Sequence, residues 1–192
     1  MSAPTLPRVS LPDGVVLRLL ASDDAPALAE AYARNAEHLA PWEPARSDDF
    51  ATERTQAIRV EGLLHGLKTG AALPLVLARP APTGAARGIE VVGTLTLSGI
   101  TRGAFESADL GYWTDRALQG RGLMSAAVSA VVGIARDDLG LHRLQAGTLP
   151  ENERSQRVLT RAGFERFGLA RDYLRIAGRW RDHVLFQRIL RD

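Results

Sequence analysis

The chain contains 192 residues, 45% of them hydrophobic and 24% charged, which are the length and composition of one globular domain with a sizeable core. Its formal net charge of +2 argues against a polybasic nucleic-acid binder, and its lack of cysteine excludes disulfides, thiolate metal sites and a cysteine nucleophile. Because the N-terminal segment lacks the apolar core of a signal peptide and no apolar run approaches the roughly 20 residues that span a bilayer, we expect a cytoplasmic protein without membrane or direct DNA contacts.

Hydrophobic periodicity and turn residues predict alternating strands and helices in the first half of the chain. They comprise a strand at residues 15–20, a helix at 25–39, a Pro-punctuated loop at 40–49, a helix at 50–70, a strand at 73–80 and a loop at 81–88. Ser22 or Asp23 is the predicted cap of the first helix, and the second helix is expected to end near Gly70.

The second half of the chain is richer in hairpin-joined strands. Two strands at 89–100 and 108–114 are followed by a helix from near Gly122, a strand at 142–149, a helix at 152–164 and a strand pair at 171–178 and 179–190. Antiparallel hairpins combined with two crossover helices predict one α/β domain with a mixed sheet. This order lacks the regular alternation of a Rossmann domain or a TIM barrel.

Two glycines surround an arginine in Gly120-Arg121-Gly122, between the strand that ends near Thr114 and the following helix. Backbone N–H groups in such a turn, together with the unpaired donors and positive dipole end of the helix, suit a phosphate or pyrophosphate. The stretch matches neither a P-loop, which needs a lysine, nor a dinucleotide fingerprint, whose third glycine is replaced by Ser125. From the local residues alone, a phosphate cradle and a plain strand-to-helix turn are both open.

The wider context of these glycines resembles a known family. "QGRGLM" is similar to the acetyl-coenzyme A signature Q/R-x-x-G-x-G/A of the GNAT superfamily, with Met124 in place of the small last residue. Further blocks in the family's order resemble its ribosomal-protein alanine N-acetyltransferase (RimJ/RimL-like) branch: "NAEHLAPWEPAR", "RGAFESADLGYW", "HRLQAGTLPENERSQRVLTRAGFE" and "RDYLRIAGRWRDHVL". The resemblance implies a single GNAT domain at 15–192 after an N-terminal extension at 1–14. Its sheet would be mixed, mostly antiparallel, splayed at a β-bulge and flanked by helices.

The resemblance also implies a site for acetyl-CoA and no metal. The pantetheine arm would pair with the exposed backbone of Tyr112–Thr114, and the pyrophosphate would sit on N–H groups from Gly120 through Ser125. Asn152 would bind the pantetheine arm, although it is also a good helix N-cap, and the side chains of the strand suit plain sheet packing. The implied cofactor-binding residues are Tyr112, Trp113, Thr114, Gln119, Gly120, Arg121, Gly122, Leu123, Met124, Ser125, Asn152 and Ser155.

The implied chemistry is direct acyl transfer from a thioester to an amine, without a covalent acetyl-enzyme. Ser155 would protonate the departing thiolate, and a backbone N–H near Tyr112–Thr114 would bind the oxyanion. Because a peptide α-amine has a pKa of about 8, one carboxylate suffices as the base. Asp109 is the first candidate and Glu43, beside the pocket-walling Trp42, is another. Further candidates are Glu106 and Asp172.

The expected acceptor is the N-terminal α-amine of a protein, as in the ribosomal-protein branch. A small-molecule amine, and a non-catalytic role as a CoA-binding or ribosome-associated regulator, are the alternatives. The basic, aromatic-containing segment 166–183 suits either RNA or an alternating hairpin, and the oligomeric state stays open. The histidines lack the spacing of metal ligands and are predicted to be surface or packing residues; they are His38, His65, His142 and His183.

Overall fold

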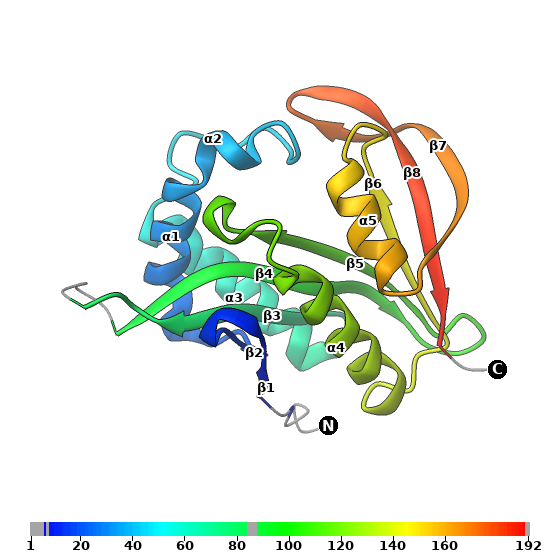
Figure 1. Ribbon diagram of the computed structural model, residues 1–192, viewed down its shortest axis with the longest axis horizontal. Coiled ribbons are helices and arrows are strands. Elements are labelled where there is room, and N and C mark those ends of the chain that lie inside the picture. Colours follow the sequence, from blue (N-terminus) through cyan, green and yellow to red (C-terminus); the bar gives the residue numbers. More distant parts are fainter. Residues whose placement is uncertain (1–5, 7, 84–87, 191–192) are drawn as a thin grey trace.

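The described residues form an eight-stranded sheet with helices on both of its faces (Figure 1). The computed structural model describes residues 6, 8–83 and 88–190. In chain order the strands and α-helices are β1 Val9–Ser10, β2 Val16–Leu19, α1 Ala25–Arg34, α2 Ala36–Leu39, α3 Glu53–Thr69, β3 Leu73–Pro80, β4 Ile89–Thr101, β5 Ser107–Thr114, α4 Leu123–Asp137, β6 Arg143–Thr148, α5 Glu153–Arg161, β7 Glu165–Ile176 and β8 Arg179–Ile189. Short 3-10 turns lie at Pro12–Gly14, Ser22–Asp24 and Arg116–Leu118.

The strands follow the order β1-β2-β3-β4-β5-β6-β8-β7, and among the described strands β5 and β6 form the parallel pair. That pairing is short, because it joins Ser107–Asp109 to Arg143–Gln145 and then stops. Beyond Asp109, β5 stays paired with β4 as far as Thr114, whereas β6 stays paired with β8 as far as Thr148. The two strands therefore diverge, and the sheet is splayed between them.

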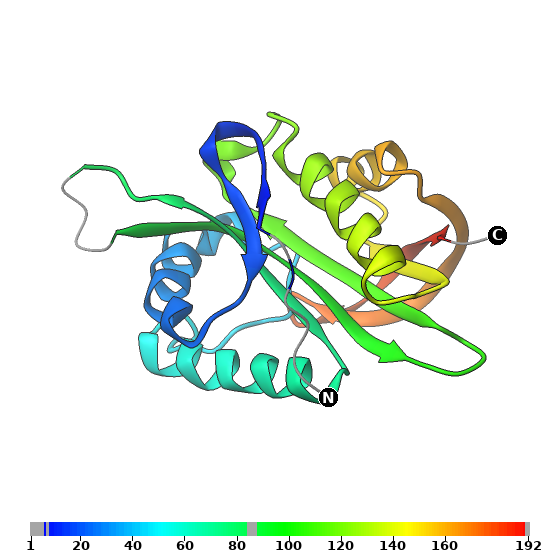
Figure 2. The same cartoon turned by 90° about the horizontal axis from the view of Figure 1, so that it is seen from below.

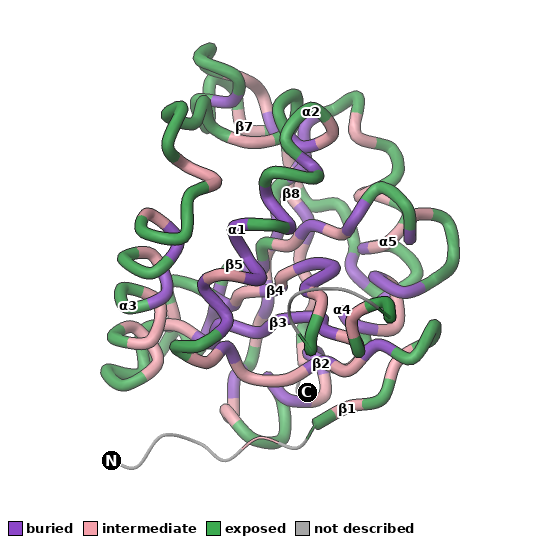
Figure 3. The backbone as a smooth tube through the Cα atoms, turned by 90° about the vertical axis from the view of Figure 1, so that its left-hand side faces the viewer, coloured by how far each residue is buried: buried purple, intermediate pink, exposed green. Residues whose placement is uncertain are grey.

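Two hydrophobic cores lie on opposite faces of the sheet, and β5 contributes to both. Leu110 packs into the larger core beneath α4, and Tyr112 packs against it, whereas Trp113 packs into the core beneath α1 and α3. Alternate side chains of a strand point to opposite faces, so this division follows from the strand's period of two. Figure 2 shows α1 and α3 on one side of the sheet and α4 on the other. The outer strand β7 is mostly exposed (Figure 3).

The predicted α/β fold class is confirmed, with a mixed, mostly antiparallel, splayed sheet. The register of the sheet shifts in several strand pairs, and the shift between β4 and β5 lies between Ser98 and Thr101, near Gly99 with its φ of 59°. From Asp109 to Thr114 the register with β4 is regular. The opening beside β5 is therefore produced by the early end of β5–β6 pairing.

Element boundaries differ from the sequence prediction in a few places. The helix predicted at 25–39 breaks at Asn35, whose buried side chain bonds outside the helix. The last hairpin begins at Glu165, earlier than the predicted 171. In the N-terminal segment, β1 pairs with β2 and widens the sheet. Part of the predicted 81–88 loop, residues 84–87, lies outside the described residues. No helix in the described part of the chain is long and apolar enough to cross a membrane.

Candidate active site

The glycine turn leads directly into α4 and leaves the first backbone donors of that helix unpaired by a side chain. Gly120 has a φ of 76° and Gly122, the N-cap of α4, a φ of 79°, and the cap makes no side-chain hydrogen bond. These left-handed conformations favour glycine, whereas a Cβ at either position would meet nothing within 4 Å. Backbone conformation, more than close packing, therefore explains the glycines. The N–H groups of Leu123–Ser125 and the positive end of a 15-residue helix therefore have the chemistry that suits an anion.

A buried carboxylate anchors the start of this turn. Asp115 directly follows β5 and is 4% exposed. Its Oδ1 accepts the backbone N–H of Ala117 at 2.9 Å, and its Oδ2 accepts from Arg34 Nε at 2.8 Å and Asn35 Nδ2 at 2.9 Å. Burial by itself raises the pKa of Asp115, but the hydrogen bonds from Asn35, Ala117 and Arg34 outweigh it and lower that pKa. Sequence reasoning missed this residue, since its partners are distant along the chain.

Gln119 ties the turn to two other elements. Its Oε1 accepts from Arg154 of α5 at 2.6 Å, and its Nε2 donates to His38 Nε2 of α2 at 2.7 Å. Burial, followed by the charge of Arg116, lowers the pKa of His38 and so favours the neutral ring, whose Nε2 can accept this bond. Arg121 instead points toward Asp13, with a 3.8 Å ion-pair distance. Of the two arginines beside the glycines, Arg116 lines the groove described below and Arg121 does not.

The start of α5 faces β5 across the splay. Asn152 caps the helix by accepting the N–H of Ser155 on its Oδ1 at 3.1 Å, and its Nδ2 has no partner among the described residues. Capping and ligand binding are therefore compatible in this one side chain. Ser155 Oγ and Tyr112 OH form a hydrogen bond of 2.8 Å, and the Tyr112 hydroxyl also lies 3.2 Å from the Ser155 carbonyl oxygen. Burial raises the pKa of Tyr112 to about 12 despite the opposing bond to Ser155.

The side chains of Trp113 and Thr114, at the end of β5, bond within the fold, as the packing interpretation held for the strand. Trp113 donates from Nε1 to Tyr32 OH at 3.0 Å, with ring centroids 5.0 Å apart. Thr114 Oγ1 donates to the Val92 carbonyl at 3.4 Å. What this segment offers a ligand is the backbone edge that faces away from β4, which β6 leaves unpaired beyond Asp109.

Two connected cavities follow from this arrangement. An outer groove of about 740 Å³ runs along the end of β5, the glycine turn and the start of α5, and arginines of the turn and of α5 lie along it: Arg116, Arg154, Arg157 and Arg161. An inner pocket of about 170 Å³ continues between β5, β6 and β8. The two cavities share the following lining residues: Leu39, Trp42, Tyr112, Trp113, Asn152 and Ser155. A long ligand in the groove can therefore present one end to a second molecule in the pocket.

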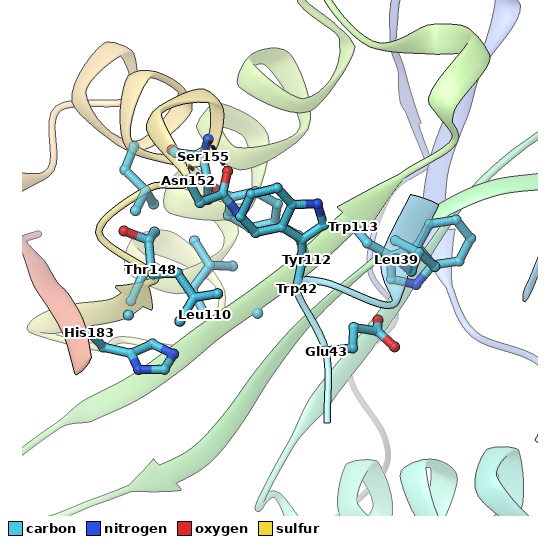
Figure 4. Close-up of a pocket in the computed structure, with 15 residues that line it drawn as sticks. Leu39, Trp42, Glu43, Leu110, Tyr112, Trp113, Thr148, Asn152, Ser155 and His183 are labelled. Carbon is cyan, nitrogen blue, oxygen red and sulfur yellow. Dashed lines mark hydrogen bonds between the residues drawn. The ribbon is translucent and has the colours of Figure 1, made fainter. Parts of the chain in front are cut away.

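The predicted acidic residues occupy different places around these cavities. Glu43 lines the inner pocket and pairs with Arg46 at 2.9 Å. Asp109 is an exposed residue and lines neither cavity. Neighbouring atoms nevertheless shield part of its carboxyl group from water, and this raises its pKa. Glu106 and Asp172 also lie outside both linings. Figure 4 shows Glu43 and His183 on opposite sides of the inner pocket, with Trp42 between them in this view.

Of the residues predicted to bind the cofactor, the structure gathers all but Arg121 along the groove. Within the described residues, no group of three or more His, Cys, Asp or Glu side chains is arranged to hold a metal ion. The site thus combines a helix N-terminus without a side-chain cap, an unpaired strand edge, a hydroxyl pair and a narrow pocket.

Comparisons with known proteins agree with this geometry. The model of the acetyltransferase (GNAT) domain family matches residues 15–165. The chain is 37% identical over 181 residues to the ribosomal protein uS5-alanine N-acetyltransferase of Escherichia coli (strain K12), over 94% of this chain and 90% of that protein. A solved structure of the ribosomal-protein-S5-alanine acetyltransferase from Vibrio fischeri superimposes with a TM-score of 0.86 and 36% identity, over 94% of this chain and 95% of that one. Mycobacterium smegmatis RimJ in complex with CoA-disulfide also gives a TM-score of 0.86, with 32% identity, over 97% of this chain and 88% of that one.

Proposed function

We propose, because this chain belongs to the GNAT acetyltransferase family, that it moves an acetyl group from acetyl-CoA to the N-terminal α-amine of a ribosomal protein. The chain is an N-acetyltransferase, and the proposal concerns its acceptor and the residues that act. The observation that carries it is the continuity of the groove with the inner pocket, which lets donor and acceptor meet directly between β5 and β6.

The residues of the groove fit the donor. The pyrophosphate would accept hydrogen bonds from the backbone N–H groups of Gly120 through Ser125. The N-cap of α4 makes no side-chain hydrogen bond to these groups. The pantetheine arm would pair with the open edge of Tyr112–Thr114 and accept from Asn152 Nδ2. The arginines along the groove add positive charge for the phosphates.

The hydroxyl pair fits the need for a proton donor. Ser155 and Tyr112 lie where groove and pocket join, which is the point at which the thioester would lie. When the C–N bond forms and the C–S bond breaks, the thiolate needs one proton, and the Ser155 hydroxyl is placed to give it. Because its pKa is about 12, the Tyr112 hydroxyl is protonated at neutral pH before the reaction. It can therefore pass a proton to Ser155 after Ser155 has protonated the thiolate.

The inner pocket fits a terminal amine. It is narrow, and its walls include the apolar side chains of Leu39, Trp42 and Leu110, which suit a small first side chain. The similar E. coli protein is named for acetylating the alanine of ribosomal protein uS5. A ribosomal acceptor also places the proposed reaction in the cytoplasm.

An experiment in E. coli tests the acceptor. The chain is expressed in a strain that lacks its own uS5-alanine N-acetyltransferase, and the intact mass of uS5 is measured. We expect the mass of one acetyl group to return at the N-terminus, and a Ser155→Ala variant to restore less of it. An unmodified uS5, together with acetylation of free amino acids or polyamines by the purified chain, would move the function to a small-molecule amine.

A further inference from the structure

His183 occupies a buried position in the inner pocket that the acetyl-transfer scheme above leaves without a role. It lies on β8, is 4% exposed and belongs to the pocket lining. Figure 4 shows its ring projecting from β8 toward β5, in the neighbourhood of Leu110 and Thr148. The sequence prediction placed this residue among surface or packing histidines.

One ring nitrogen of His183 is already committed. Nδ1 lies 3.0 Å from the Arg181 carbonyl oxygen, and since a carbonyl only accepts, Nδ1 carries the hydrogen and donates it. In the neutral ring this leaves the lone pair on Nε2. Nε2 has no hydrogen-bond partner among the described residues. It is also absent from the unpartnered side-chain atoms that are fully enclosed, so it can be reached from the pocket. The ring is therefore held by one nitrogen and offers the other as a proton acceptor.

None of the described groups around the ring forms a hydrogen bond with Nε2, so this nitrogen is available to a ligand in the pocket. The Tyr173 ring of β7 packs against it with centroids 5.5 Å apart, and β6 contributes Gly147 and Thr148, which do not ionise. The Thr148 hydroxyl is buried and has no hydrogen-bond partner among the described residues, so a polar group entering the pocket can satisfy it. On β8 itself, the side chain of Arg181 pairs with Glu151.

The other ionisable groups of the pocket each have a partner within the fold. Tyr112 of β5 bonds to Ser155, and Glu43 of the segment after α2 pairs with Arg46. Asp109 lies outside the lining. His183 thus combines three properties of a general base: access to the pocket, a fixed tautomer and a free lone pair.

We propose that His183 is the general base that takes the proton from the acceptor amine, an inference that rests on the acetyl transfer proposed above. The neutral amine attacks the thioester carbonyl as Nε2 accepts one of its protons, so that a C–N bond forms. The C–S bond then breaks, and the thiolate leaves as CoA thiol with a proton from Ser155. His183 releases its proton to solvent, and the hydroxyl pair regains one, so the products are the acetylated amine and CoA. Histidine is the side chain that enzymes use most often for such proton transfers.

The test uses the full chain, acetyl-CoA and a peptide that begins with alanine, and it follows kcat and kcat/KM from about pH 6 to about pH 9. In His183→Asn the amide can still donate to the Arg181 carbonyl, but nothing replaces Nε2. We expect kcat at neutral pH to fall about 10²-fold or more and then to rise steadily with pH as hydroxide takes over, whereas the unmodified chain levels off. The dissociation constant for CoA should stay unchanged. His65→Asn, an exposed substitution on α3, is the control and should change neither quantity.

A His183→Asn chain with kcat and a pH profile like those of the unmodified protein would overturn the proposal. His183→Ala supplies a second route, because added imidazole should restore part of its activity if only the base is missing. Failure of imidazole to restore activity in a chain that still binds CoA also contradicts the role. If the unmodified chain acetylates no peptide at all, the proposed acceptor fails first, and this role of His183 fails with it. An active chain with an unaffected variant removes His183 alone.

Discussion

The outer groove and the inner pocket are built in different ways. The groove is lined by side chains of α5 and of the segment around α2, but its proposed phosphate-binding part consists of backbone atoms of one continuous stretch, the end of β5, the glycine turn and the first turn of α4. The pocket depends on side chains from separate segments, with Trp42 and Glu43 after α2, Thr148 on β6 and His183 on β8. A site made of neighbouring backbone groups leaves a local motif, and a site made of distant side chains does not. This difference also means that changes in the two regions should alter different measured constants.

The largest expected effect comes from the carboxylate that anchors the groove. Asp115→Ala removes the partner of Arg34, Asn35 and the Ala117 N–H in a buried place, so the free energy of unfolding should fall by about 3–5 kcal/mol. The affinity for CoA should fall with it. Chemical denaturation and CoA titration measure both, with the exposed Asp138→Ala as a control that stays within about 0.5 kcal/mol. A stable variant with ordinary CoA affinity would show that the turn does not need this anchor.

The same carboxylate makes stability depend on acid. Because the folded pKa of Asp115 is below its unfolded value, its contribution is fully present above about pH 4 and is lost as the pH falls through the folded pKa. Unfolding measured across this range should show a smaller acid-induced loss of stability in Asp115→Ala than in the unmodified chain. Parallel curves would contradict this contribution.

A kinetic effect of similar size is expected where the two regions meet. Ser155→Ala removes the proton donor for the thiolate, so kcat should fall about 10²-fold, or about 2.7 kcal/mol of activation free energy, with little change in CoA affinity. Tyr112→Phe keeps the ring and should give a smaller loss. Steady-state rates of CoA release check both variants. Equal rates in all three proteins would assign the proton to water instead.

The glycine turn should show a smaller effect. Gly122→Ala forces a side chain into a φ of 79° and should destabilise the turn by about 1–2 kcal/mol, weakening CoA binding more than it raises the KM for peptide. Gly133→Ala, within α4 and with open space around its Cβ, is the matched control and should be neutral or stabilising by up to about 1 kcal/mol. If both variants bind CoA equally well, the left-handed cap is not what holds the pyrophosphate.

The smallest effect is expected at Asp109. Since its carboxylate lines neither cavity, Asp109→Asn should leave kcat/KM and its pH profile within about threefold, a difference of less than 1 kcal/mol. The measurement is the same series of pH–rate curves. A large loss of kcat/KM that recovers at high pH would instead identify Asp109 as the general base, as predicted from the sequence.

Local sequence signals can identify residues that the structure then brings together. The glycines before an Ala-rich helix, and Asn152 at the start of α5, are local signals, and the structure places both along the groove. The break at Asn35 could not be predicted, because its side chain bonds to Asp115 and to the backbone of Arg116 across the fold. The only sequence signal for Asp115 is an acidic residue one position after the strand.

The role proposed for His183 could not be predicted from the sequence either, because it also depends on residues that are distant along the chain. It lies in a segment of alternating polar and apolar residues that reads as an ordinary hairpin strand. Its burial, its bond to the Arg181 carbonyl and its place in the pocket follow from the pairing of β8 with β6 and β7, which no local pattern encodes.

The most direct test of the account is the position of the transferred acetyl group. The purified chain is incubated with acetyl-CoA and a peptide that begins with alanine and contains an internal lysine, and tandem mass spectrometry locates the modification. The account predicts one acetyl group on the N-terminal nitrogen, formed together with CoA thiol. Acetylation of the lysine side chain alone, or no acetylation by a chain that binds CoA, would contradict it.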